Sequence, residues 1–451
     1  MEDLLTSLNT TSIASDISNT TTNTVSSVKN IDTITNSTTS TTTTTTPTII
    51  NSENDKDILI PALLSSELIS NSKNSMIKQS KEKGRYVVAK QDIKSGESIV
   101  FREEPYVVCM NYKDPYERKI CHHCFGLSST TSKSMTTTPD FTLHCDTCNI
   151  VWYCSNHCQL NDLIYHKHEC FTYKRMQSSS QFDTSCKTSI KLLLKLIIKQ
   201  YLEIKDQSLS LNPSSSIESK EVRFKDILTL ETNLNKFSTQ RITEFRMISK
   251  FIEKTMDKEF LKVICPTNKE VIEFQNNLIK LMCILECNSH DISFTIPQST
   301  KSSYEYFSIG IGLYYHSSMF NHSCTPNICK VIESKQHPQP ISTEKVQYSG
   351  NFATHSMIAI KDIKKDEEIS FNYIQVTLSK VDRLKKLESS YHFQCKCPSC
   401  IGDVNNKASI KSHSQFIEKH ICKSKTGNCS GILFPLNDNL ICNICRPIIL
   451  K

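Results

Sequence analysis

Cysteine pairs at the spacing of metal ligands constrain this chain more than any other feature. Twenty-one of its 451 residues are cysteine, and segment 121–170 holds seven of them with a ligand-type histidine. Zinc takes four nitrogen or sulfur ligands in a tetrahedron, and a close pair on a tight turn supplies two of them with little loss of entropy. Eight ligands make two sites, in which the first and third pairs share one ion and the second and fourth share the other. The pairs are Cys121 and Cys124, Cys145 and Cys148, Cys154 and Cys158, and His166 and Cys170.

A disulfide framework, or incidental free thiols, would be the alternative use of these cysteines. Disulfides persist in oxidising compartments. The N-terminus, however, lacks the basic and apolar regions of a secretory signal. The chain also lacks an apolar run of about 18 residues, the length that a membrane span needs. We therefore expect an intracellular protein of the cytoplasm, the nucleus or both, with zinc as the use of the paired cysteines and no membrane partner.

Polar low-complexity segments separate the ordered blocks of the chain. Thr, Ser and Asn dominate the leader, residues 1–75, above all up to about residue 54, and they cannot bury enough apolar surface to offset the entropy of ordering. The leader is therefore predicted to be disordered. Similar runs at Ser128–Pro139, Gln207–Ser219 and Ser334–Ser342 are typical of expanded surface loops, which folds tolerate at small cost.

The hydrophobic period changes along the ordered part of the chain. Short β-prone runs lie at 86–89 and 98–108, and the β pattern returns at 305–329 and 356–374. Between them, apolar residues three and four apart predict amphipathic helices, first over Ile190–Tyr201 and then through residues 223–287. This order predicts an α+β protein in which one discontinuous β domain carries inserted modules.

A second set of motifs lies in the C-terminal half of the chain. Asn321-His322-Ser323-Cys324 is followed by Glu367-Glu368-Ile369-Ser370-Phe371-Asn372-Tyr373 and then by Cys395-x-Cys397-x2-Cys400. Each of these motifs alone is weak evidence for a family, but their order along the chain is specific evidence. With Gly84-Arg85-Tyr86 and the Trp152-Tyr153-Cys154 of the Cys/His segment, they resemble a SET domain split by a MYND zinc finger. This is the pattern of the SET and MYND domain-containing family of protein lysine methyltransferases.

The resemblance implies a β-rich SET domain interrupted by a MYND zinc finger and a helical insert. A Cys-rich post-SET segment and a small zinc-ribbon-like tail follow. In this arrangement the domains are 80–120 for the first part of SET, 121–170 for the finger, 175–287 for the helical insert, 288–374 for the SET core, 375–400 for post-SET and 401–451 for the tail.

The resemblance also implies S-adenosyl-L-methionine as cofactor and assigns the residues around it. Tyr373 matches the catalytic tyrosine, and Tyr373, Tyr391 and Phe393 match the aromatic walls of a lysine channel. Three positions depart from the family pattern. Tyr86 stands where a second glycine of the cofactor loop belongs, Leu163 stands where the finger usually has Trp, and Asp366 stands where Gly commonly precedes the two Glu residues. The positions that match cofactor contacts are Lys83, Gly84, Arg85, Asn288, Ser318, Met319, Asn321, His322, Tyr373 and Phe393.

Two further cysteine clusters predict metal sites outside the finger. Cys395, Cys397 and Cys400 are three ligands without a fourth nearby in the sequence. The family implies Cys324 as the fourth ligand. The residues alone also allow Cys329 or a water in that position. The tail holds four cysteines whose spacing suits a small zinc ribbon, with incidental cysteines in a frayed terminus as the alternative. They are Cys422, Cys429, Cys442 and Cys445. The unpaired remainder is most simply buried and apolar: Cys109, Cys186, Cys265, Cys283, Cys287 and Cys329.

The predicted function is transfer of methyl groups from S-adenosylmethionine to lysine of a histone or another protein. The family further implies a proline-containing peptide as partner of the finger. A zinc-dependent interaction scaffold without catalysis is the alternative. A nucleic acid is disfavoured as main ligand, because thiolate ligands and four zinc ions move the formal charge from +7 to about zero.

Overall fold

The computed structural model describes residues 58–59, 74–128, 140–209, 222–297, 304–332, 353–423, 429–436 and 439–445. All of them belong to one unit, Asp55–Lys451. Most of the predicted leader and of the three predicted loop expansions lies outside the described residues. Within that leader, however, Ile58–Leu59 forms strand β1, which pairs antiparallel with β2.

A five-stranded sheet brings the distant SET-type motifs together. Its order is β1-β2-β3-β13-β10, and its last pair is parallel, so that Asn321 lies beside Ser370 and His322 beside Phe371. The chain before Gly84 forms β2, whose Ile77 is buried. Polar residues at Ser75 and over Lys78–Ser80 hide the period of this strand. The strands are β2 (Ser75–Ser80), β3 (Gly84–Ala89), β13 (Glu368–Phe371) and β10 (Asn321–His322).

Two three-stranded sheets complete the β part. One has the order β11-β12-β4 and the other β5-β9-β8, with antiparallel pairing throughout both. Their strands are β4 (Ser98–Glu103), β5 (Val107–Met110), β8 (Ser289–Pro297), β9 (Tyr304–Leu313), β11 (Ile328–Ile332) and β12 (His355–Ala359). Two-stranded ribbons lie in the finger and the tail: β6 (Leu143–His144) with β7 (Trp152–Tyr153), and β14 (Leu433–Leu436) with β15 (Asn439–Cys442).

Helices of the insert contribute much of the largest apolar core, which also includes residues of the sheets and of the finger. Helix α3 (Thr184–Leu209) packs against α2, α5 and α7, and it buries the apolar face that the helical period predicts, from Ile190 to Tyr201. The first of these helices, α2, starts inside the predicted finger rather than after it. The others are α2 (Asn156–Ser178), α4 (Phe224–Ile227), α5 (Thr239–Thr255), α6 (Lys258–Ile264) and α7 (Asn268–Asn288), with short 3-10 turns η1 (Glu117–Lys119), η2 (Leu234–Lys236) and η3 (Ser317–Met319).

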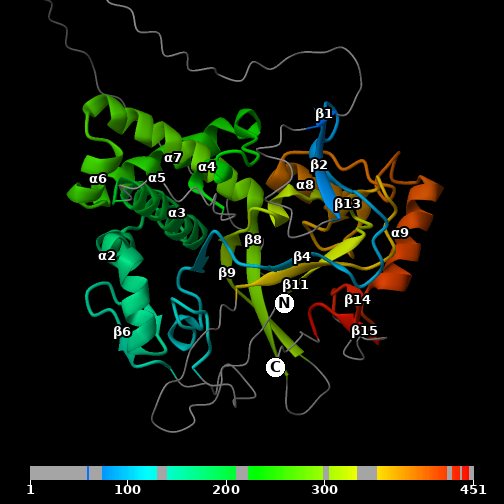
Figure 1. Ribbon diagram of the computed structural model, residues 1–451, viewed down its shortest axis with the longest axis horizontal. Helices are drawn as coiled ribbons and strands as arrows, with labels where there is room; N and C mark the ends of the chain where they lie inside the picture. Colours follow the sequence, from blue (N-terminus) through cyan, green and yellow to red (C-terminus); the bar gives the residue numbers. More distant parts are fainter. Residues whose placement is uncertain are drawn as a thin grey trace, which may run out of the picture. The chain divides into compact units, whose positions relative to one another are not determined.

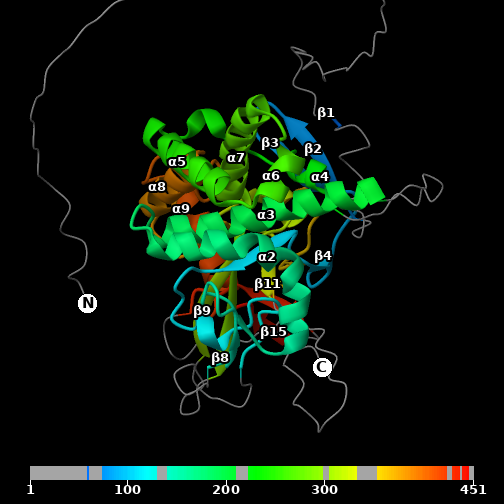
Figure 2. The same cartoon turned by 90° about the vertical axis from the view of Figure 1, so that its left-hand side faces the viewer.

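The C-terminal part adds two helices to the β core. Figure 1 shows the long strands β8 and β9 between the insert helices and these two C-terminal helices, which are drawn in orange. Figure 2 shows α3 crossing in front of the sheets. Helix α8 (Lys380–Tyr391) ends at a predicted channel residue, and α9 (Lys407–His420) lies inside the predicted tail, where the spacing of cysteines indicated only a ribbon. The mixed α+β class is confirmed. In the part of the chain described, no helix combines the length and apolarity needed to cross a membrane.

Candidate functional site

One cavity gathers every residue that the resemblance assigned to cofactor and channel. It has a volume of about 800 Å3 and lies between the turn before β3, the η3–β10 segment and the post-SET segment. Such a volume is within the range of ligand-binding clefts. The predicted residues in its wall are Lys83, Gly84, Arg85, Asn288, Ser318, Met319, Asn321, His322, Tyr373, Tyr391 and Phe393.

The turn before β3 leaves room for a ligand near its backbone. Gly84 has φ +64°, in the left-handed region that favours glycine, and a Cβ built on it meets no atom within 4 Å. Tyr86, the departure from the family's glycine pattern, does not line this cavity; it is buried in β3, opposite Lys78 of β2. The side chain of Tyr86 therefore leaves the cavity open.

A second cavity meets the first at the predicted catalytic tyrosine. This cavity has a volume of about 560 Å3 and extends along the start of β8, β11 and the C-terminal hairpin. Its wall does not include Lys83, Gly84 or Arg85. Most of the residues that line one cavity are absent from the lining of the other. The residues common to both are Cys287, Asn288, Ser318, Tyr373 and Tyr391.

Tyr373 is held in place by its hydroxyl, its backbone and its ring. Its hydroxyl donates to the carbonyl of Phe320 at 2.6 Å, and the hydroxyl of Tyr391 donates to the carbonyl of Tyr373 at 3.3 Å. The rings of Tyr391 and Phe393 lie 5.0 and 6.3 Å from its own ring. Burial, with repulsion from Tyr391, raises the pKa of Tyr373 above its usual value, so the hydroxyl stays protonated at neutral pH.

His322 connects this tyrosine to a cysteine cluster. Its Nδ1 accepts the backbone N–H of Tyr373 at 3.0 Å, which leaves the ring proton on Nε2, 3.2 Å from the sulfur of Cys324. Burial lowers the pKa of His322 to about 4, so the ring is neutral at neutral pH. The position of the Tyr373 backbone therefore depends on the loop that carries Cys324.

Asn288 and Ser318 join the helical insert to the η3 segment. The Asn288 amide donates to the carbonyls of Glu231 and Ile284 at 2.8 and 2.7 Å, and the Ser318 hydroxyl donates to the carbonyl of Tyr314 at 2.6 Å. Both side chains are thus fixed by backbone acceptors. They therefore give the cavity its shape and a fixed backbone, because their donor groups are already bound to these acceptors.

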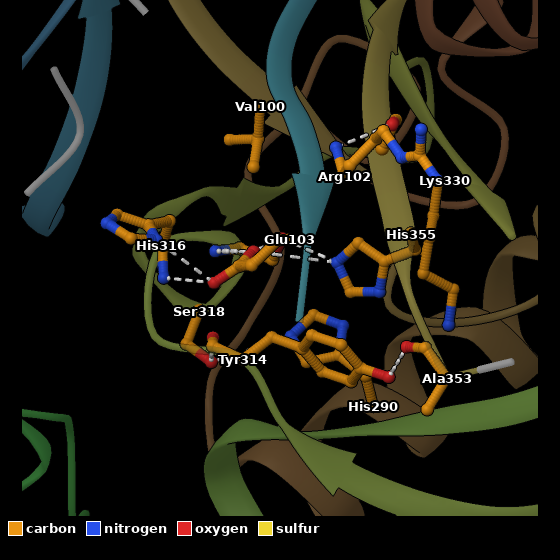
Figure 3. Close-up of polar contacts among 12 residues, drawn as sticks. Val100, Arg102, Glu103, His290, Tyr314, His316, Ser318, Lys330, Ala353 and His355 are labelled. Atoms are coloured by element: carbon orange, nitrogen blue, oxygen red, sulfur yellow. Dashed lines mark hydrogen bonds and ion pairs between the residues drawn. The ribbon is translucent and has the colours of Figure 1, made fainter. Parts of the chain in front are cut away.

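A buried carboxylate holds the η3 segment in place through hydrogen bonds. Glu103, at the end of β4, accepts the backbone N–H group of His316 at 2.7 Å (Figure 3). It also accepts the backbone N–H group of Ser317 at 3.1 Å and the Ser317 hydroxyl. Nε2 of His355 lies 2.7 Å from that hydroxyl oxygen and therefore donates to it. Burial opposes ionisation of Glu103, but the rings of His316 and His355, 3.2 and 3.6 Å from the carboxylate, outweigh it and hold the pKa of the carboxyl well below its usual value.

The finger segment brings its eight predicted ligands into two tetrads. Cys121, Cys124, Cys154 and Cys158 form one, and Cys145, Cys148, His166 and Cys170 form the other, with ligand atoms within 4.8 Å of one another. This is the interleaved grouping that the spacing predicts. All cysteines of the described residues are free thiols, which excludes a disulfide framework among them.

Charged side chains behind the finger tie it to the helical insert. Nδ1 of His166 lies 3.7 Å from the carboxylate of Glu169, a contact typical of metal-bound histidine. Lys195 of α3 places its ammonium 3.3 Å from Glu169 and 3.1 Å from Asp162, both on α2 and both buried. The ammonium thereby supplies a positive charge to two carboxylates that are buried side by side.

The post-SET tetrad consists of Cys324, Cys395, Cys397 and Cys400. Cys329, the alternative that the sequence left open, lies in β11 within a separate apolar core. Beside the tetrad, the buried guanidinium of Arg383 donates to the carbonyls of Leu378 and Ser399 and lies 3.8 Å from the sulfur of Cys400. A cation at this place offsets the negative charge of thiolate ligands.

The tail tetrad, Cys422, Cys429, Cys442 and Cys445, is surrounded by backbone donors. The N–H groups of residues 444 and 445 both donate to the sulfur of Cys442 at 3.4 Å, and Gly431 donates to the sulfur of Cys429 at 3.4 Å. Hydrogen bonds of this kind stabilise thiolates rather than neutral thiols. They favour a metal site over incidental cysteines.

The sulfur separations in all four tetrads match a tetrahedral zinc site. Zn–S bonds of about 2.3 Å place ligand sulfurs about 3.8 Å apart. In the finger, Cys124–Cys154 and Cys145–Cys170 are both 3.7 Å apart. Cys324–Cys400 measures 3.5 Å and Cys422–Cys445 measures 3.6 Å. The four tetrads could therefore each hold one zinc ion, with the donor set that zinc prefers.

Sequence reasoning missed Glu103, Lys195 and Arg383, and it misplaced Cys287. The first three belong to no motif, and their partners become visible only in the fold. Cys287 and Cys186 are only partly buried, so the expectation of buried cysteines was wrong for these two. Cys287 lines both cavities, and burial raises the pKa of its thiol to about 11, which keeps it protonated at neutral pH.

Comparison with known proteins gives the family. A model described as SET domain matches residues 84–374. A SET domain-containing protein of Dictyostelium discoideum is 25% identical over 410 residues, which cover 83% of this chain and 95% of that protein. A SET and MYND domain-containing protein of the same organism is 26% identical over 379 residues, 79% of this chain and 88% of that protein. A histone-lysine N-methyltransferase of Arabidopsis thaliana is 24% identical over 369 residues, 81% and 62% of the two chains. The chain thus belongs to the SET domain family, with SET and MYND domain-containing proteins among its relatives.

Proposed function

We propose that this protein is an S-adenosylmethionine-dependent protein-lysine N-methyltransferase. The observation that carries the proposal is the meeting of two cavities at Tyr373 and Tyr391. A transferase needs one entry for the cofactor and another for the substrate, with both reaching the reacting centre. The family match over residues 84–374 and a relative named as a histone-lysine N-methyltransferase support the same activity.

The larger cavity is the proposed cofactor site. Asn321 and the backbone around Gly84 would contact the polar groups of the cofactor, and Ser318 and Met319 would line its inner side. When bound, S-adenosylmethionine supplies an electrophilic methyl group on a sulfonium. Phe393 closes this cavity from the post-SET side.

The residues at the junction prepare the lysine for attack. Methyl transfer requires a neutral amine, and an aromatic channel lowers the pKa of an entering ammonium by removing its water. The protonated hydroxyl of Tyr373 and the carbonyl of Phe320 lie 2.6 Å apart and together offer polar contacts to the reacting groups. Orientation of this kind accounts for a large share of the rate in such displacements.

Zinc in the four tetrads is the proposed structural metal. Thiolate tetrads without an open position are typical of structural rather than catalytic zinc. The post-SET ion would hold Tyr391 and Phe393 against the SET core, since Cys395–Cys400 follow these residues directly. The finger ions would organise a module that packs on α3 through Lys195.

The test is radiolabelled methyl transfer onto a panel of histones and other proteins. Tyr373→Phe removes one positioned hydroxyl and should reduce transfer about 100- to 1,000-fold. Its affinity for S-adenosylmethionine, measured by calorimetry, should remain within a factor of about two, because the ring and backbone stay. Leu440→Ala, on the exposed face of β15, is the control. Full transfer by Tyr373→Phe would contradict the assignment of the tyrosine.

An interaction scaffold is the second candidate, and the finger helix favours it. Four large apolar side chains of α2 are exposed, namely Leu160, Leu163, Ile164 and Phe171, and such patches are typical of protein contacts. A scaffold would bind its partner through the finger without binding the cofactor. Calorimetry separates the two functions, because a scaffold gives no heat with S-adenosylmethionine.

A further inference from the structure

The C-terminal hairpin forms one wall of the second cavity. Two sulfur ligands of the tail tetrad line it, together with the residues beside them. The lining also includes Tyr373 and Tyr391, which are part of the cofactor cavity as well. The hairpin residues in the wall are Cys429, Ser430, Asn443, Ile444 and Cys445.

Apolar packing and one hydrogen bond hold the hairpin in this place. Ile432 and Phe434 are buried in a core shared with Val331 of β11 and Ile358 of β12. Nearer the cavity, the amide of Asn443 donates to the carbonyl of Lys330 at 2.9 Å. The wall is therefore part of the folded SET core rather than a loose terminus.

The tetrad determines the shape of that wall. The hydrogen bonds to its sulfurs come from the backbone of Gly431, Ile444 and Cys445, and the last two of these residues line the cavity. A Cβ at Gly431 would collide with the sulfur of Cys442. The local chain thus folds around the ligand sulfurs, and the side chains of residues 430, 443 and 444 take fixed positions from it.

The second cavity fits the chain of a protein substrate. Residues 83–85, at the start of β3, line the cofactor cavity alone, so an amine that reaches Tyr373 must come through the other cavity. Residues on either side of that lysine then lie along the cavity wall. Ile444 presents an apolar side chain there, whereas the charged groups of the lining, Asp291, Lys330 and Lys386, come from other elements.

We propose that the C-terminal hairpin selects the residues that flank the target lysine, with Ile444 as a specificity-determining side chain. The inference rests on the proposed methyltransferase function. It assigns to the tail tetrad a role in substrate choice that is separate from cofactor binding. An apolar residue of the substrate should be preferred at the position that contacts Ile444.

A lysine-centred library of degenerate peptides, labelled with radioactive S-adenosylmethionine, tests this directly. Ile444→Glu should shift the preference at one flanking position toward basic residues, and Ile444→Lys toward acidic residues, by about two- to five-fold, the effect of an exposed ion pair. Leu440→Glu puts the same charge on the same hairpin outside the cavity and should keep the wild-type pattern. Zinc content measured by mass spectrometry verifies that each variant retains its tetrad.

The outcomes separate this inference from the proposed function. Ser430→Glu replaces Ile444→Glu as the probe if that variant loses zinc, and it should produce the same shift toward basic residues. Charge variants that keep their zinc and label the library like the wild type would overturn the role of the hairpin alone. A wild-type protein that labels no peptide and binds no S-adenosylmethionine would overturn the proposed function and this inference with it.

Discussion

The post-SET and tail tetrads have the same four-cysteine ligand set but differ in how much of the chain they join. In the post-SET tetrad, Cys324 and Cys400 are 76 residues apart and both are buried. In the tail tetrad, Cys422 and Cys445 are only 23 residues apart, and Cys442 is the one buried ligand among its four. Identical ligands therefore serve different purposes. The first joins distant segments of the site, and the second folds a local hairpin.

The surroundings of the two tetrads differ in the same way. Arg383 beside the post-SET tetrad contacts α9 as well, since its guanidinium lies 2.9 Å from Nε2 of His413. On the other side, His322 lies between Cys324 and the backbone of Tyr373. The tail tetrad receives backbone N–H groups of its own hairpin instead. A metal ion in the post-SET tetrad is thus expected to control catalysis, and one in the tail tetrad substrate choice.

Removal of a post-SET ligand should have the largest effect. Cys324→Ser should lose one zinc ion per chain and reduce methyl transfer by more than about 100-fold, because the loop that supports His322 and Tyr373 loses its anchor. Zinc content and radiolabelled transfer check this. Cys329→Ala is the matched control, since Cys329 is a buried cysteine of the adjacent strand that belongs to no tetrad. Equal zinc content in the two variants would contradict the difference between these cysteines.

Removal of the buried guanidinium of Arg383 should have the second-largest effect. Arg383→Met leaves the negative tetrad without its neighbouring charge and should lower the free energy of unfolding by about 3 kcal/mol. Chemical denaturation measures this change. Arg383→Lys keeps the charge but loses the planar fork, so an intermediate loss is expected. An unchanged stability of Arg383→Met would show that the post-SET tetrad needs no more support than the tail tetrad.

A smaller effect should come from the anchor of η3, which depends on neither tetrad. Glu103→Gln should lower the free energy of unfolding by about 2 kcal/mol at neutral pH, through the loss of charge-assisted hydrogen bonds. Because the pKa of folded Glu103 is depressed, its contribution is present above the unfolded value of about 4.3 and is lost as pH falls toward the folded pKa.

Thermal melting of both proteins from neutral to acidic pH checks this sign. The difference in melting temperature between wild type and Glu103→Gln should shrink below about pH 4. Loss of metal in acid affects both proteins alike, so the difference reports on Glu103 alone. A difference that grows as pH falls would contradict the ionised state of the carboxyl.

Local motifs explain how much of the site could be predicted. Paired cysteines and Asn321-His322-Ser323-Cys324 carry their chemistry within a few residues, so their spacing indicated both the ligands and the family. The partners of Glu103 could not be found in this way, because its hydrogen bond to Ser317 spans 214 residues. Lys195 and Arg383 have the sequence appearance of ordinary basic residues on helices. Only the packing of α3 on α2, and of α8 on the post-SET segment, makes them buried counter-charges.

The same reasoning applies to the elements that the sequence did not indicate. Strand β2 contains lysine and serine at positions that break the apolar alternation, and its place in the sheet comes from pairing with β3. Helix α9 is polar on most of its surface and buries few residues, among them Phe416. Tertiary contacts determine the secondary structure of these two segments, whereas the long apolar face of α3 is sufficient to predict a helix from the sequence.

The most direct test of the central claim is the binding of S-adenosylmethionine to wild type, Cys324→Ser and Cys445→Ser, measured by calorimetry under identical conditions. Wild type and Cys445→Ser should bind with affinities within a factor of about two of each other, because the tail lines only the second cavity. Cys324→Ser should bind at least about ten-fold more weakly. No binding by wild type, or equal affinities for both variants, would contradict the claim that the cofactor cavity is formed at Tyr373 and supported by the post-SET tetrad.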